Sequence, residues 1–218
     1  MLKSLKQRLI KLLSKRNKAI VLESYLEAKN KFLSGDFVGA EIFFAQNNFV
    51  LEYGYCKLLS GDFAGAKAIF STIASTDLRA DWAGKLIQFV EGYVAFPPSF
   101  FQIRNFLEID LNLLIQAKRP EYVENIINGA DIFYSINPES YKFIARVMMF
   151  NDYLSIAVHY LMKAKDKFYY DPEMHFMLAQ CYMKTGEIVL AKQSIKACLS
   201  ILPNYIPAVV LKDKLNLL

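Results

Sequence analysis

The sequence predicts an all-α fold, an α-solenoid in which antiparallel helix pairs stack on one another. The first observation is a near-duplication: FLSGDFVGAEIFF at residues 32–44 returns as LLSGDFAGAKAIF at residues 58–70. The second is that apolar residues around both copies recur at helical spacing. The third is a longer repeat in the C-terminal half, with a period of about 34 residues. Because one amphipathic hairpin cannot bury its apolar face alone, repeated hairpins cover one another.

Residues 23–95 are predicted to form two short helix hairpins and a following helix. In each hairpin a glycine, Gly35 or Gly61, stops the first helix, and the next residue, Asp36 or Asp62, caps the second. Small residues behind each cap are expected to let the two helices approach closely, namely Gly39, Ala40, Gly65 and Ala66. The next segment, DWAGKLIQFVEGYVAF, reads as a helix that carries the single tryptophan, Trp82.

Residues 96–103 are predicted to form a bend between the two halves, because Pro97 and Pro98 disfavour helix at the residue before each. We favour a rigid loop here. The alternative is an exposed aromatic docking corner formed by Phe96, Phe100 and Phe101.

Three units of the longer period are predicted to follow, at 104–137, 138–171 and 172–205. Shifts of one period bring Lys118, Asp152 and Gly186 to the same turn position. Residues 206–218 begin with a proline near a helix start, which is typical of a helix that caps the last unit.

The third unit has small residues at Ala179, Ala191 and Cys198, a turn glycine at Gly186 and a late proline at Pro203. This pattern resembles the tetratricopeptide repeat (TPR), and the match is best over residues 172–205. The resemblance implies a right-handed superhelix whose concave groove binds peptide segments of other proteins.

The resemblance also implies which residues line that groove. The candidates are Asn105, Glu108, Asn112, Gln116, Lys142, Arg146, Met149, Phe176, Gln180 and Met183, and the same repeat positions hold Ile115, Glu139, Phe150, Glu173 and Lys184. Lys142 and Arg146 are four residues apart and share one helix face, which suits them to hold a carboxylate of a ligand peptide. The alternative, that they are ordinary charges on a solvated face, is the commoner situation.

Residues 1–22 hold seven basic residues and no acidic one, so they account for the whole surplus in a chain of net charge +5. Five leucines of this segment fall within about 100° of a helical wheel. The segment is predicted to contact an anionic membrane or an acidic partner through Leu2, Leu5, Lys6, Leu9, Lys11 and Leu12. Equally favoured is an N-terminal cap on the first hairpin. A flexible basic arm and a mitochondrial targeting peptide are the remaining interpretations.

No catalytic, cofactor-binding or metal-binding site is predicted. The two histidines, His159 and His175, lie on different expected helices without a cysteine or carboxylate cluster, and no phosphate-binding or nucleophile motif is present. Three widely spaced cysteines, Cys56, Cys181 and Cys198, are expected to be buried thiols.

The sequence therefore predicts a non-enzymatic TPR-like scaffold that binds a peptide segment of another protein. It is expected to be cytoplasmic, held at a membrane surface through residues 1–18 if the first helix contacts lipid. A self-assembling structural solenoid is the alternative, and a nucleic-acid binder that uses the basic arm is the least favoured.

Overall fold

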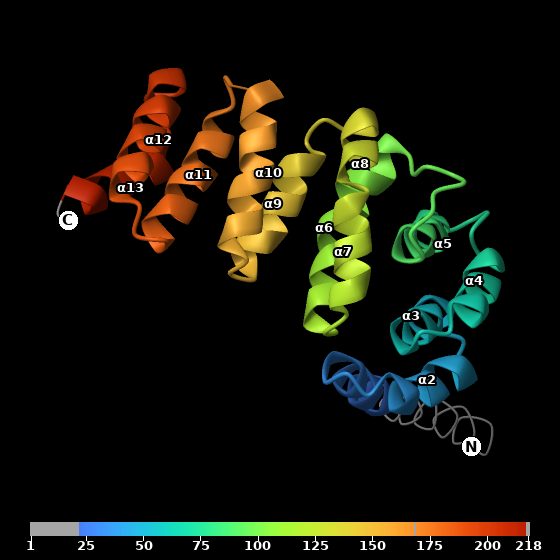
Figure 1. The fold of residues 1–218 in the computed structure, drawn as a ribbon. Helices are drawn as coiled ribbons and strands as arrows, with labels where there is room; N and C mark the ends of the chain where they lie inside the picture. Colours follow the sequence, from blue (N-terminus) through green and yellow to red (C-terminus); the bar gives the residue numbers. More distant parts are fainter. Residues whose placement is uncertain (1–21, 168, 217–218) are drawn as a thin grey trace, which may run out of the picture. The chain divides into compact units, whose positions relative to one another are not determined.

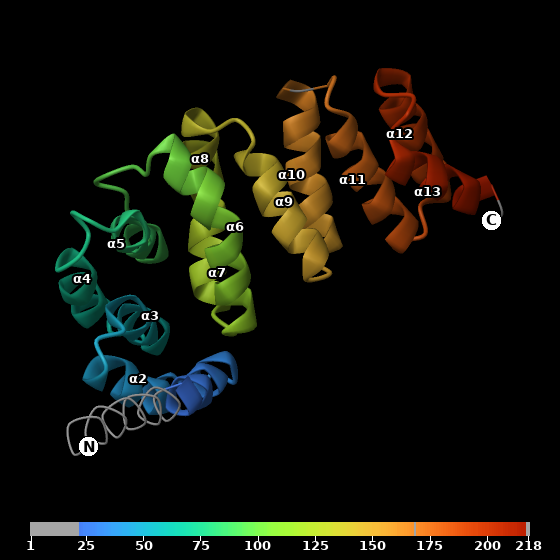
Figure 2. The ribbon, with the colours of Figure 1, turned by 180° about the vertical axis from the view of Figure 1, so that it is seen from behind.

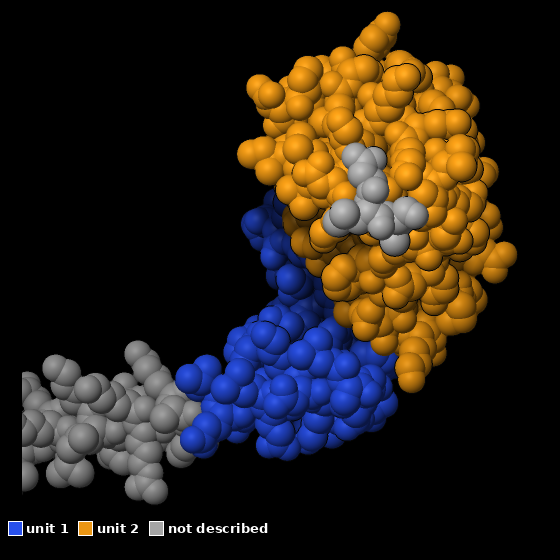
Figure 3. All heavy atoms as spheres, turned by 90° about the vertical axis from the view of Figure 1, so that its left-hand side faces the viewer, with its two compact units in different colours: residues 1–88 blue, residues 89–218 orange. Residues whose placement is uncertain are grey.

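The computed structural model describes residues 22–167 and 169–216, and all regular secondary structure in these residues is helical. The predicted all-α class is confirmed. The chain divides into two compact units, residues 1–88 and residues 89–218 (Figure 3).

The first unit contains a run of short helices joined by tight turns. Residues 22–33 are helical and are followed by α2 (Phe37–Gln46), α3 (Val50–Ser60), α4 (Phe63–Ser71) and α5 (Leu78–Val90), whose last two residues belong to the second unit. Helix α3 packs against both α2 and α4 (Figure 1). Trp82 of α5 is fully buried.

The two copies of the duplicated segment adopt the same local structure, with α2 and α4 both capped by aspartate as predicted. The carboxylate of Asp36 accepts a hydrogen bond from the amide of Gly39, and Asp62 accepts one from Gly65, each at 2.9 Å. A side chain on either glycine would collide with the capping carboxylate, at 2.1 Å for Gly39 and 2.4 Å for Gly65. These glycines therefore make room for the cap, while the small residues next to them, Ala40 and Ala66, are fully buried.

A glycine that allows close helix packing lies instead at Gly54 in α3. A β-carbon built there would lie 2.3 Å from the ring of Phe70 on α4. Phe70 is 1 % exposed and its ring meets that of Tyr55 edge to face. Gly54 thus allows α3 and α4 to pack at their observed separation.

Helix α5 ends earlier than the sequence suggested. The predicted helix continued to Phe96, whereas α5 stops at Val90 and Gly92 adopts a left-handed conformation with φ +80°. The backbone amide of Gly92 donates a hydrogen bond to the carbonyl of Phe89 at 3.0 Å. Gly92 therefore terminates the helix, as left-handed residues commonly do.

Residues 91–99 contain no helix, and the bend ends before the predicted residue 103. The hydroxyl of Ser99 accepts from the amide of Gln102, and the Gln102 side chain accepts in return from the amide of Ser99. This capping box starts the next helix at Phe100. Phe96, Phe100 and Phe101 all remain exposed, Phe100 the least of the three.

The second unit is a succession of helix pairs. Its helices are α6 (Phe100–Gln116), α7 (Pro120–Asn128), α8 (Ala130–Ile136), α9 (Ser140–Phe150), α10 (Leu154–Lys167), α11 (Pro172–Lys184), α12 (Ile188–Ile201) and α13 (Ile206–Asn216). The pairs α6/α7, α9/α10 and α11/α12 follow one another (Figures 1 and 2), and α6 also packs against α9, α9 against α11 and α12 against α13.

Each of these pairs turns through a left-handed residue at the same position. That residue is Lys118 at φ 55°, Asp152 at φ 60° and Gly186 at φ 80°, which are the three residues aligned by the longer period. In each turn the amide of the following residue bonds back five positions, as in Arg119 to Leu114 at 3.0 Å. The Schellman geometry thus recurs even where glycine is absent.

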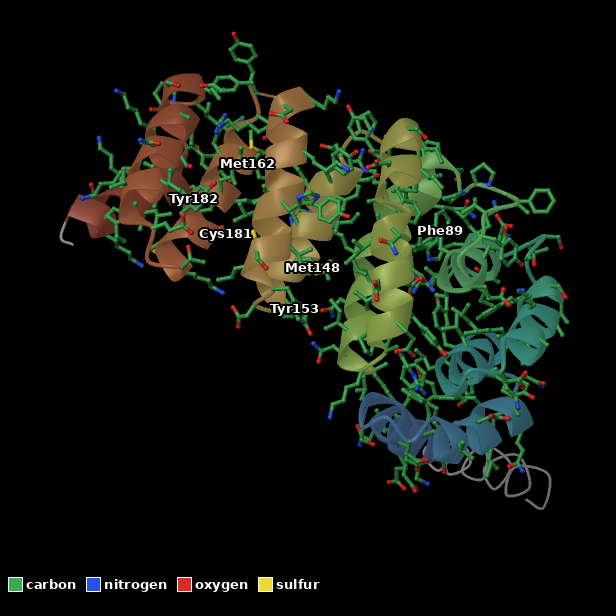
Figure 4. The ribbon with its side chains drawn as sticks, in the orientation of Figure 1. Phe89, Met148, Tyr153, Met162, Cys181 and Tyr182 are labelled. Carbon is green, nitrogen blue, oxygen red and sulfur yellow. The ribbon has the colours of Figure 1, made fainter. Side chains whose placement is uncertain are left out.

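The second helix of the first long unit is broken, which the sequence did not predict. Helix α7 ends at Asn128, Gly129 caps it, and α8 starts at Ala130. A β-carbon at Gly129 would lie 2.6 Å from the ring of Phe89, which stacks on Phe133 at 4.3 Å between ring centroids. The backbone at Gly129 therefore passes directly against a buried aromatic pair; Phe89 is labelled in Figure 4.

Candidate functional site

The candidate site is built around Arg146 in the middle of α9. Its guanidinium bonds to Glu108 of α6 and, at 2.9 Å, to Glu173 of α11. The first helices of three consecutive pairs are therefore joined by one side chain. We call the surface that carries these contacts the first-helix face.

Lys142 lies one turn before Arg146 and is also surrounded by carboxylates. Its ammonium lies 2.6 Å from Asp171 and 3.4 Å from both Glu139 and Glu173. The other oxygen of Asp171 accepts hydrogen bonds from the amides of Glu173 and Met174. Asp171 thus caps α11 and binds α9 at the same time.

The electrostatics of this network follow from partial burial. Burial alone lowers the pKa of Lys142, but the hydrogen bond and charge of Asp171 offset it and leave the pKa raised. Burial also lowers the pKa of Arg146, but the charges and hydrogen bonds of Glu108 and Glu173 outweigh this effect and leave its pKa raised. Burial raises the pKa of Glu108, with Arg146 opposing it and Glu173 adding to it. Both cations therefore stay charged at neutral pH.

A second layer of polar contacts lies at the other end of α9. The side-chain amide of Asn151 donates a hydrogen bond to the side chain of Asn112 at 2.9 Å and accepts one from the side chain of Gln116 at 2.8 Å. It therefore links the end of α9 to α6. Lys184 at the end of α11 pairs with Asp152 at 2.6 Å. These bonds join the same three helices as Arg146 does.

The predicted groove residues thus fall into groups. The structure brings together Glu108, Asn112, Gln116, Lys142 and Arg146 in these layers. Two others pack away from them: Phe176, whose ring meets that of Tyr205, and Met183 lie against the apolar cluster of α11, α12 and α13. Asn105 is exposed, and Met149 and Gln180 are half-buried.

The charge balance bears on the hypothesis that Lys142 and Arg146 hold a ligand carboxylate. Both cations are already engaged by carboxylates of this chain, Glu108, Glu139, Asp171 and Glu173. A ligand carboxylate would have to displace one of them. Sequence reasoning missed Asp171, although an aspartate directly before Pro172 is the usual signature of a helix start.

A hollow of about 350 Å³ borders the network. It is lined by Glu139, Lys142, Lys167, Tyr169, Tyr170 and Asp171. Tyr170 is 83 % exposed, which is unusual for so large a ring. The hollow therefore combines two carboxylates and two lysines with accessible aromatic rings.

The remaining chemically interesting side chains are structural. Cys56, Cys181 and Cys198 are buried free thiols, and burial raises the pKa of Cys56 to about 12 and that of Cys181 to about 11. His175 is buried, and its Nε2 donates to the carbonyl of Tyr169 at 2.7 Å. In the described part of the chain no three His, Cys, Asp or Glu side chains gather as a metal site requires.

The predicted membrane-contact residues, Leu2 to Leu12, lie outside the described residues. None of the described helices combines the length and apolar character that crossing a membrane requires. Comparisons with protein-family models, with curated proteins and with solved structures give no match for this sequence.

Proposed function

We propose that this chain is a non-enzymatic, TPR-like helical-repeat scaffold that binds a peptide segment of a partner protein along its first-helix face. Two features support the repeat assignment: the first helices of successive pairs pack on one another, and each pair turns at the same left-handed position. The single observation that carries the binding proposal is the link from Glu108 through Arg146 to Glu173, which makes one continuous polar surface from three helices.

The charges on this face favour a peptide that carries lysine or arginine. Four carboxylates surround the two cations, so the network keeps an excess of negative charge. A basic side chain gains from that excess without displacing an existing pair. A carboxylate of a ligand would meet repulsion as well as competition for Lys142 and Arg146.

The hollow beside the network offers a place for such a side chain. Cations bind the faces of aromatic rings, and Tyr169 and Tyr170 line the hollow together with Glu139 and Asp171. A guanidinium or ammonium entering there meets the carboxylates of Glu139 and Asp171 and the two tyrosine rings, while Lys142 is already paired with those carboxylates and Lys167 adds one positive charge. Polar, aromatic contact surfaces of this kind are typical of peptide recognition.

Selection of a random peptide library on the full-length protein tests the proposal. Enriched segments are expected to contain lysine or arginine, and a selected peptide should bind the Glu108→Gln/Glu173→Gln protein about tenfold more weakly. The control, Glu121→Gln/Asp166→Asn, removes the same charge from two exposed positions and should bind like the parent. Enrichment of acidic segments, or equal weakening by both double substitutions, would contradict the proposal.

Membrane contact through the N-terminal segment is a separate proposal, supported by its seven basic residues and its leucine stripe. Co-sedimentation with anionic vesicles, with and without residues 1–20, tests it. Loss of lipid binding with unchanged melting supports membrane contact, whereas a lower melting temperature without lipid binding supports a cap on the first hairpin.

A further inference from the structure

A second hollow lies between α12 and α13, away from the first-helix face. Its volume is about 530 Å³, and its apolar lining comes from Ile195 and Leu199 of α12 and Leu215 of α13. Ile195 and Leu215 are part of the buried cluster through which these helices pack. They are 2 % and 1 % exposed, so they form the floor of the hollow, and the half-buried Leu199 is its most accessible apolar side chain.

Three lysines surround this apolar surface. Lys192 and Lys196 come from α12 and Lys212 from α13. Among the described residues none of the three forms an ion pair, in contrast to the paired lysines elsewhere in this unit, Lys142, Lys163 and Lys184. Lys192 and Lys196 are four residues apart on one helix, where like charges repel. The rim thus carries positive charge that nothing in the described chain neutralises.

The repeat indicates what kind of group fits beside α12. Two periods earlier in the chain, Glu124 and Ile127 of α7 occupy the positions of Lys192 and Ile195, and they also line a hollow, of about 520 Å³. There the opposite wall comes from α10, through Ile156. Met148 and Tyr153, labelled in Figure 4, complete that hollow. At α12 and α13 no described helix occupies the place of α10, so this side of the hollow can accept a helix.

We propose that the hollow between α12 and α13 binds an acidic amphipathic helix of a partner protein. The apolar stripe of that helix packs on Leu199 and on the aliphatic stems of the lysines above Ile195 and Leu215, and its flanking carboxylates pair with the three lysines. The only acidic residue of α13, Asp213, is not among the residues that line the hollow. The strongly basic residues 1–22 of another copy have the wrong charge for this site, which disfavours self-association through that segment.

The site is independent of the proposed function, because it uses different helices and the opposite charge. The test uses helical peptides of about 18 residues, or five turns, that share one leucine stripe and carry glutamate, glutamine or lysine beside it. Fluorescence anisotropy measures their affinity for the full-length protein. The glutamate peptide should bind most tightly, and its affinity should fall steeply as salt rises.

The matched variants are Lys192→Glu/Lys196→Glu and, as a control, Lys29→Glu/Arg104→Glu, which makes the same charge change at two other exposed basic residues. The first variant should bind the glutamate peptide about tenfold more weakly or worse, and the control variant should bind it with the parent's affinity. Circular dichroism verifies that both variants fold, and a photo-reactive group on the leucine stripe should crosslink to α12 or α13.

Three results would overturn the inference. One is the absence of saturable binding by the glutamate peptide, and another is equal binding to both double variants. The third is evidence for a different occupant. In that case the glutamate peptide does not bind, and the protein instead binds anionic vesicles or dimerises with rising concentration, and Lys192→Glu/Lys196→Glu abolishes that binding or dimerisation. If the basic-peptide experiment on the first-helix face fails, the inference about the hollow between α12 and α13 still stands, because the two tests use different peptides and different variants.

Discussion

The close packing at Gly54 gives a prediction in which one substitution has opposite effects at two positions. Gly54 and Gly84 both lie inside helices of the first unit, α3 and α5. A β-carbon at Gly54 meets the ring of Phe70, whereas one at Gly84 meets no atom within 4 Å. Gly54→Ala should therefore destabilise the protein, and Gly84→Ala should stabilise it.

The magnitudes follow from the distances. The new carbon at Gly54 would lie 2.3, 2.7 and 2.8 Å from three atoms of one ring, while carbon atoms normally pack about 3.5–4.0 Å apart. Phe70 is buried against Tyr55, so the helices must separate, at a cost of about 1–3 kcal/mol. Alanine regains about 0.5–1 kcal/mol of helix propensity. The net loss at Gly54 is about 0.5–2 kcal/mol, against a gain of about 0.5–1 kcal/mol at Gly84.

Urea unfolding of the full-length chain, followed by the fluorescence of buried Trp82, measures both effects within the unit where they occur. The midpoint should fall for Gly54→Ala and rise for Gly84→Ala at similar slope. If Gly54→Ala is as stable as the parent while Gly84→Ala is more stable, α3 and α4 do not pack as closely as described, and the reasoning is refuted.

Four further predictions concern single groups. Lys118→Gly should raise the free energy of unfolding by up to about 1 kcal/mol, because glycine adopts the left-handed turn without strain. Urea unfolding should therefore show a higher midpoint, and a lower midpoint would contradict this. Arg146→Met should cost about 1–2 kcal/mol at pH 7 and less near pH 4, because burial raises the pKa of its partner Glu108 and favours the protonated carboxyl there; equal losses at both pH values would rule out the ionic explanation. Burial lowers the pKa of His175 below 6.5, so the folded state favours the neutral ring, and stability should decline as the pH falls below 6.5 in the parent but less in His175→Gln. Because burial raises the pKa of Cys56 to about 12 and of Cys181 to about 11, neither thiol should react with Ellman's reagent at pH 8 until denaturant is added; rapid reaction of the native protein would show that they are accessible.

The all-α class and the turn positions were predictable because they depend on local chemistry. Asp36 and Asp62 were recognised as caps from their neighbours alone. The alignment of the longer repeats also placed Lys118 and Asp152 at the turn that Gly186 marks. The break at Gly129 was not predictable, since it accompanies a contact with Phe89 of α5, which is distant from it in the sequence.

The candidate site was predictable in its residue types but not in its connections. Helical spacing placed Lys142 and Arg146 on one face. It gave no information on which carboxylates approach from α6 and from the start of α11, because those contacts depend on how the pairs stack. Tertiary packing therefore decided whether the cations were available to a ligand or already neutralised.

The course of α5 has a practical consequence for dividing the protein. The boundary between the units falls between Gln88 and Phe89, inside an uninterrupted helix. A fragment that starts at residue 89 would have no helical turn ahead of Phe89, whose ring stacks on Phe133. An expression fragment intended to retain the C-terminal repeats should therefore begin at Asp77, whose carboxylate accepts the amides of Arg79 and Ala80 and so supplies a natural starting point for the recombinant chain.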